Sequence, residues 1–157
     1  MNDTTQKINK PQDIAAGPNY SAVHCGAYSD LHQYELDFPG RGVLKAGKVF
    51  LQELVKTTGM EVSINNLPVG QEVPFSHAHK ENEELFIFTR GQGTMAIDGE
   101  LVPVQEGSCV RLAPAAARCL KNTGSEALYF IVVQAKANSL GEHTFADGYR
   151  VEQELKW

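Results

Sequence analysis

The sequence predicts an all-β protein, a sandwich or barrel, and two observations support this fold class. From about residue 48 onward, short apolar runs are separated by Gly, Pro, Asn and Asp, which is typical of strands joined by turns. Within this region, the MEVSINN segment over 60–66 alternates apolar and polar side chains, as a strand with one buried face does. With 157 residues, of which 42% are hydrophobic and 21% charged, the chain is expected to form one globular domain.

The remaining strands are expected in order along the chain. The KVFLQELV run over 48–55 precedes the alternating segment, and the ELFIFTR run over 84–90 ends at a glycine. Asp98-Gly99 separates two apolar runs and predicts a hairpin, because a type I′ turn needs positive φ at both central positions. Three further apolar runs indicate strands, the last of them long enough for a core strand: 108–113, 118–122 and 127–137.

The two ends of the chain differ from this central region. Residues 1–20 are polar, carry Pro11 and Pro18, and are expected to form a flexible or edge segment. Residues 138–157 are mixed in character and show no sustained period. We therefore expect one domain over 21–157, with a barrel core over about 48–137 and short extensions at both ends.

The charge pattern and the cysteines limit the classes of partner. The formal net charge is −5 and the Lys and Arg residues are scattered, so no basic patch for nucleic acid is expected. No apolar run approaches the roughly 18 residues that a membrane-spanning helix needs. The three cysteines are an odd number without CxxC spacing, and the first residues lack the apolar stretch of a secretory signal, which favours the cytoplasm. A small molecule is the expected partner.

One cluster of residue types indicates metal chemistry. On a strand, His77 and His79 project from the same face, and Glu84 follows five residues later at the start of the next strand. Glu83 should point to the opposite face and be solvated. Two imidazoles and one carboxylate form a facial N,N,O set with open coordination positions. Such a set would hold a divalent ion: Fe, Mn, Ni, Co or Zn.

Two segments carry a family resemblance. The stretch 70–91, GQEVPFSHAHKENEELFIFTRG, resembles the first cupin motif, with one extra residue before the first histidine; the stretch 107–122, GSCVRLAPAAARCLKN, resembles the second. The chain thus resembles a small single-domain cupin of the cupin 2 conserved-barrel type. The resemblance implies a double-stranded β-helix, or jelly-roll, barrel, and it implies metal ligands at His77, His79 and Glu84.

Arg118 stands where the second motif usually supplies another histidine ligand. A guanidinium has no free lone pair for a metal, which leaves two alternatives. Either an anionic ligand bridges Arg118 and a three-ligand metal, or Arg118 pairs with Glu84 in a metal-free site; a plain surface cation is a third reading. In the first case Arg118 binds substrate, together with Phe86 and Phe88, which share a face with Glu84 and otherwise fill the core.

The function remains open among three classes. A metal-dependent enzyme would act on a small anionic substrate bearing a carboxylate or oxo group. A non-catalytic module would bind a sugar or small acid for sensing or storage. A metal-free, epimerase-like cupin would use His77 or His79 as general base. The sequence identifies no catalytic residue. The apolar 48–55 run could pair two copies along an edge strand, so a homodimer is also expected.

Overall fold

The structure is a computed structural model, and it describes residues 6–7, 12–38, 42–45, 47–143, 145–155 and 157. Strands dominate the described chain, with one 3-10 helix and one short α-helix among them. Before the barrel lie β1 (Gln6–Lys7), β2 (Gln12–Gly17), β3 (Tyr20–His24), the 3-10 helix η1 (Tyr28–Gln33), β4 (Glu35–Phe38) and β5 (Gly42–Lys45). The barrel region contains β6 (Lys48–Phe50), α1 (Gln52–Val55), β7 (Glu61–Leu67), β8 (Asn82–Arg90), β9 (Gln92–Ile97), β10 (Glu100–Gln105), β11 (Cys109–Leu112), β12 (Arg118–Lys121) and β13 (Leu128–Lys136).

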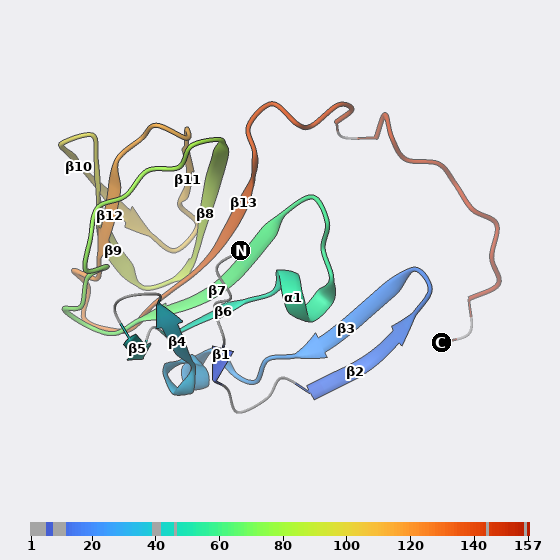
Figure 1. The fold of residues 1–157 in the computed structure, drawn as a ribbon, viewed down its shortest axis with the longest axis horizontal. Coiled ribbons are helices and arrows are strands. Elements are labelled where there is room, and N and C mark those ends of the chain that lie inside the picture. Colours follow the sequence, from blue (N-terminus) through green and yellow to red (C-terminus); the bar gives the residue numbers. More distant parts are fainter. Residues whose placement is uncertain (1–5, 8–11, 39–41, 46, 144, 156) are drawn as a thin grey trace.

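Two antiparallel sheets form the barrel on the left of Figure 1. One has five strands in the order β11-β8-β13-β7-β6, and the other has three in the order β10-β9-β12. The segment before β8 joins the smaller sheet through two isolated bridges, Glu72 with Lys121 and His77 with Arg118. Strands distant in sequence are therefore neighbours, as the jelly-roll expectation requires.

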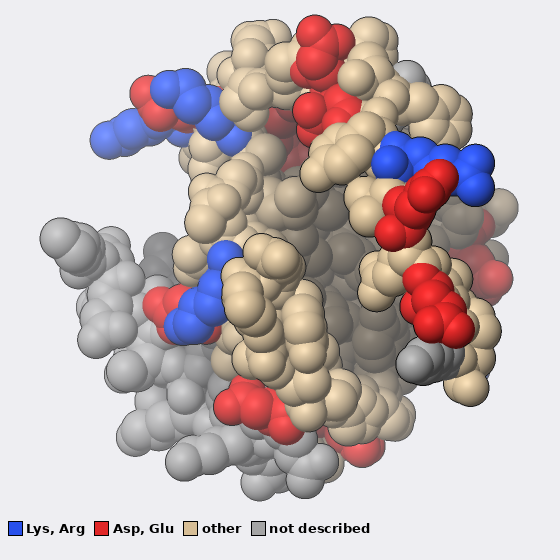
Figure 2. Space-filling view, turned by 90° about the vertical axis from the view of Figure 1, so that its right-hand side faces the viewer, with Lys and Arg blue, Asp and Glu red and all other residues tan. Residues whose placement is uncertain are grey.

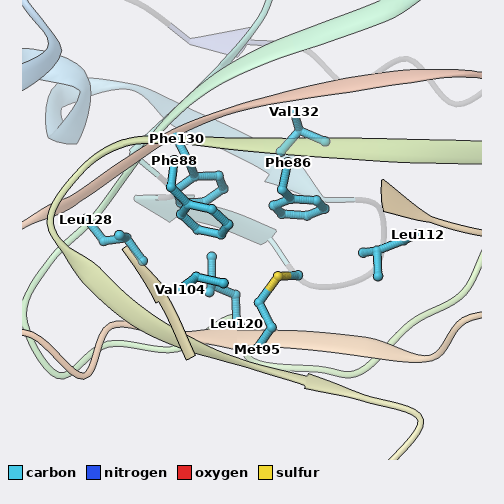
Figure 3. Packing of buried hydrophobic residues seen from close by; sticks show 9 residues of the cluster. All are labelled: Phe86, Phe88, Met95, Val104, Leu112, Leu120, Leu128, Phe130 and Val132. Atoms are coloured by element: carbon cyan, nitrogen blue, oxygen red, sulfur yellow. The ribbon is translucent and has the colours of Figure 1, made fainter. Parts of the chain in front are cut away.

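The core lies between these two sheets. Three phenylalanines of the larger sheet, Phe86, Phe88 and Phe130, pack with ring centroids 5.6 to 6.3 Å apart. They face buried side chains of the smaller sheet, and Figure 3 shows both groups pointing into the same interior. The full cluster comprises Phe86, Phe88, Met95, Val104, Leu112, Leu120, Leu128, Phe130 and Val132.

The expected turns are present. Asp98 and Gly99 have φ values of 50° and 90°, and they join β9 to β10 in the antiparallel register expected of the hairpin. Gly91, which closes the first motif, has a φ of 87°, and a Cβ there would lie 2.7 Å from the carbonyl oxygen of Ala127. Only glycine fits that close approach without strain.

The prediction of one strand over 48–55 is wrong in its second half. Strand β6 ends at Phe50, and residues Gln52–Val55 form α1. The amide of Gln52 donates to a carboxylate oxygen of Glu61 at 3.0 Å, and Lys56 ends the turn in the left-handed conformation. Gln, Glu and Leu also favour helix. An apolar run of this length does not distinguish a strand from a strand followed by one helical turn.

The segments outside the barrel are short. Strands β2 and β3 form a hairpin at the lower right of Figure 1, so part of the expected edge segment is regular. A second cluster, Leu31, Tyr34 and Val49, packs on the outer side of β6 and β7. Residues after β13 run away from the barrel (Figure 1) and form no regular element in the part described. No described helix has the length and hydrophobicity of a membrane span.

The charges are mixed on the face that Figure 2 shows. This face is hollowed near its centre, and Asp and Glu side chains lie at several places around the hollow. Lys and Arg side chains form separate groups rather than one continuous patch on this face.

Candidate metal centre

The segment that carries His77 and His79 is extended but is not a regular strand. The amide of His77 donates to the carbonyl of Arg118 at 3.2 Å, and the amide of Arg118 donates back to His77 at 3.0 Å. The amide of His79 donates to the carbonyl of Pro114 at 2.8 Å. The strand expected for these histidines is thus reduced to one bridge and one further bond. These bonds still fix the backbone on both sides of the imidazole pair.

Glu84 comes from the opposite sheet, where it is the third residue of β8. It pairs in register with Leu112 of β11 and Gln134 of β13. Its side chain lies on the inner face of the barrel with Phe86 and Phe88, because alternate residues of a strand share a face. The residue is only 6% exposed, so its charge needs a partner inside the barrel.

The three predicted ligands come together. One ligand atom from each of His77, His79 and Glu84 lies within 4.8 Å of the other two. The two imidazole rings are nearly perpendicular, with centroids 5.5 Å apart, and Nε2 of His79 lies 3.2 Å from Oε1 of Glu84. An ion placed among these atoms would meet two nitrogens and one oxygen, a donor set that suits first-row divalent metals.

Two nitrogens of this cluster are buried without a hydrogen-bond partner. They are Nδ1 of His77 and Nε2 of His79; the latter lies close to Glu84 but not in hydrogen-bond geometry. A buried polar atom left unsatisfied costs about 1–3 kcal/mol. A metal ion would satisfy a nitrogen that presents its lone pair to the cluster, so the residues present fit a metal.

Arg118 is fully inside the barrel, with 1% of its surface exposed. Its Nε donates to Oε2 of Glu84 at 3.0 Å, Nη2 donates to the same oxygen, and Nη1 donates to the carbonyl of Ala116 at 2.9 Å. The reading of Arg118 as a plain surface cation is therefore wrong. The Arg118–Glu84 pair of the second alternative exists, but it uses Oε2 only and leaves Oε1 directed at His79. The pair and a metal are thus compatible.

The surroundings keep His77 in the form that can bind a metal. Burial lowers the pKa of His77, and the positive charge of Arg118 lowers it further, against the opposing effect of Glu84. A lowered pKa keeps the imidazole neutral over more of the physiological range, and only a neutral imidazole has a lone pair for a metal.

Two other predictions meet the structure differently. Glu83 points to the outer face as alternation predicted, where it pairs with Arg111. Phe86 and Phe88 belong to the hydrophobic core, so their core role is present and their contact with a substrate stays a prediction.

The sequence analysis gave no role to Lys48, which lies on β6 near this site. The only signal in the sequence was a cation at the start of an apolar run.

The fold and the site together define a small β-barrel with a candidate metal centre inside it, and comparisons with known proteins agree with the barrel fold. The cupin domain family matches residues 64–134. A cupin protein from Bacteroides fragilis is 39% identical, with a TM-score of 0.65, over 71% of this chain and 94% of that one. A cupin 2 conserved barrel domain protein from Salinispora arenicola is 21% identical, with a TM-score of 0.53, over 59% of this chain and 77% of that one. The comparison with curated proteins gives no match.

The chain belongs to the cupin family. The identity and coverage of the Bacteroides fragilis protein carry this conclusion, and the family match spans β7 to β13, which hold most of the barrel. Fold and family leave the chemistry open, because one fold hosts many activities.

Proposed function

We propose that this cupin binds one divalent metal ion through His77, His79 and Glu84 and presents it to a small anionic ligand. The observation that carries the proposal is that one potential ligand atom from each of the three residues lies within 4.8 Å of the other two. Two of these residues, His77 and His79, also hold buried nitrogens without hydrogen-bond partners. Fe, Mn, Ni, Co and Zn all accept this donor set. The ion would act as a Lewis acid or oxygen-activating centre.

The role we propose for Arg118 is to hold Glu84. With Nε and Nη2 both on Oε2, the guanidinium fixes the carboxylate and leaves Oε1 for the metal. Such residues behind the ligands orient them and tune their affinity. Contact of Arg118 with substrate, the earlier expectation, would require it to leave Glu84 or to use its remaining protons.

Elemental analysis tests the metal proposal. Protein purified without added metal, and again after incubation with Fe(II), Mn, Co, Ni or Zn salts, is expected to hold about one ion per chain. His77→Ala should lose the ion, whereas His24→Ala, an exposed histidine on β3, should retain it. If the wild type takes up no ion under any of these conditions, the proposal is wrong.

A metal-free, epimerase-like cupin is the second candidate. The 3.2 Å contact between Nε2 of His79 and Oε1 of Glu84 favours it, because a carboxylate beside an imidazole can orient a general base. Activity that survives complete removal of metal, and that is lost in His79→Ala, would favour this candidate over the first. A sugar- or acid-sensing module would instead retain its ligand without forming product.

Two further expectations extend the proposal to the cell. We propose a cytoplasmic setting, supported by three cysteines that are all free. We also propose a homodimer through β6, which ends the five-stranded sheet. Because Val49 already packs in the second cluster, pairing would rely on the strand's backbone rather than on its apolar side chains. Sedimentation of the full chain tests this, and a monomer at high concentration would refute it.

A further inference from the structure

The anion that this site would receive lacks an obvious receptor. Arg118 was the expected one, but its Nε and Nη2 bind Glu84 and its Nη1 binds the carbonyl of Ala116. Four other cations of the barrel strands are engaged on the outer surface in ion pairs with Glu: Arg90, Arg111, Lys121 and Lys136. One cation of the barrel strands remains to be considered, and it is Lys48.

Strand register places Lys48 on the inner face of the larger sheet. Lys48 lies opposite Asn65, and Asn65 lies opposite Phe130, which is part of the core. Directly opposed residues share a face. Val49, the next residue, packs in the cluster on the other side of the sheet. The side chain of Lys48 therefore enters the barrel, unlike the four paired surface cations.

The ammonium of Lys48 leans toward the metal cluster. It lies over the ring of Phe50, 4.5 Å from the centroid, and Phe50 is one row further along the sheet, in line with Ser63 and Phe86 through Val132. Glu84 is the next inner residue of β8 beyond Phe86. Electrostatic effects agree with this placement. Burial lowers the pKa of Lys48, whereas the negative charge of Glu84 raises it. Lys48 is in turn among the groups whose positive charge lowers the pKa of His77.

This ammonium lies over the Phe50 ring and forms no hydrogen bond or ion pair with a carboxylate or carbonyl among the residues that the structure describes. A lysine ammonium carries three donors, and an aromatic face compensates only part of their lost hydration, by about 0.5–2 kcal/mol. Lys48 as a residue is half-buried rather than fully buried. A partly desolvated cation with free donors, open to an incoming molecule, favours binding an oxyanion.

We propose that Lys48 is the anion-binding residue of this site and that its ammonium binds an oxygen of a small carboxylate or phosphate ligand in the barrel, beside the metal ion held by His77, His79 and Glu84. The metal ion in this inference rests on the proposed function. The contact between Lys48 and the anion does not depend on a bound metal. It assigns specificity to β6, outside the two cupin motifs.

Calorimetric titration with acetate, succinate and inorganic phosphate tests the inference, on protein before and after loading with Ni²⁺. The wild type should bind at least one of these anions. Lys48→Met should weaken that binding about tenfold or more while keeping the same metal content, and Lys48→Arg should keep it within about threefold. Lys121→Met, which removes a cation from the outer surface, should leave it unchanged. Succinamide, the neutral analogue of succinate, should not bind detectably.

Two results would overturn the inference: wild type that binds none of the three anions in either form, and Lys48→Met that binds them as the wild type does. Stability distinguishes a merely structural role. A lysine that only neutralises Glu84 would lower the melting temperature when replaced, whereas a binding lysine costs desolvation in the empty protein, so Lys48→Met should melt at the same temperature or higher. If no metal binds but anion binding still depends on Lys48, the metal proposal fails and the Lys48 assignment stands.

Discussion

Glu83 and Glu84 are neighbours on β8, and each pairs with an arginine, but on opposite faces of the strand. Glu83 meets Arg111 on the outer face, where the arginine side chain is 60% exposed. Glu84 meets Arg118 on the inner face, where the arginine is 1% exposed. The two pairs have the same chemistry and nearly the same place in the sequence. They differ in their exposure to solvent, and this difference decides how much each pair contributes to stability.

The outer pair is a solvated contact that adds little to stability. The inner pair removes two charges from water, so neither member can be left alone. Across the barrel interior, the imidazoles of His77 and His79 keep buried nitrogens without hydrogen-bond partners. The interior thus combines a buried ion pair, which must stay complete, with imidazole nitrogens that lack partners, and we infer that this combination positions Glu84 for a metal.

Of the changes that test this comparison, removal of Arg118 should have the largest effect on the free energy of unfolding. Arg118→Met leaves the carboxylate of Glu84 buried without its partner, and we expect a loss of about 3–5 kcal/mol in the free energy of unfolding, measured by urea denaturation. Glu84→Gln combined with Arg118→Met should recover most of this loss, because no uncompensated charge remains. A loss below about 1 kcal/mol in the single variant would show that the inner pair behaves like the outer one.

Metal addition should have the next largest effect, and it should act on the inner face alone. A ligand present at a hundred times its dissociation constant, and bound only by the folded state, stabilises a protein by about 2.7 kcal/mol. We expect a stabilisation of this size for the wild type, seen as a shift of the urea midpoint. His77→Ala should abolish it, and Arg111→Met should leave it intact. An equal shift in His77→Ala would place the ion elsewhere.

Most strands of the barrel and the grouping of His77, His79 and Glu84 could be predicted from local sequence. Alternation over 60–66 and the Asp98-Gly99 pair are signals contained within a few residues, and the corresponding elements β7 and the β9–β10 hairpin form as expected. The spacing of His77, His79 and Glu84 is equally local, and the approach of one potential ligand atom from each to within 4.8 Å of the others follows from the barrel that the motifs indicate.

The partnership of Arg118 and the position of Lys48 could not be predicted in this way. Arg118 and Glu84 are 34 residues apart, and their contact depends on how the smaller sheet faces the larger one. The inward direction of Lys48 depends on its register with Asn65. Local patterns also misjudged residues 52–55, because a four-residue helix is too short to show its period.

Removal of the outer arginine should have the smallest effect, and it isolates the role of solvent. Arg111→Met breaks the contact with Glu83 but leaves that carboxylate in water, so we expect a loss of about 0–1 kcal/mol in the free energy of unfolding. In about 1 M NaCl, where the Debye length is about 3 Å, this small loss should shrink further, whereas the loss in Arg118→Met should persist because the barrel excludes salt. Parallel urea titrations of both variants at low and high salt measure the difference. Equal salt dependence in the two would mean that water reaches Glu84 as freely as it reaches Glu83, and the inner face would then lack the dry environment on which the proposed metal centre depends.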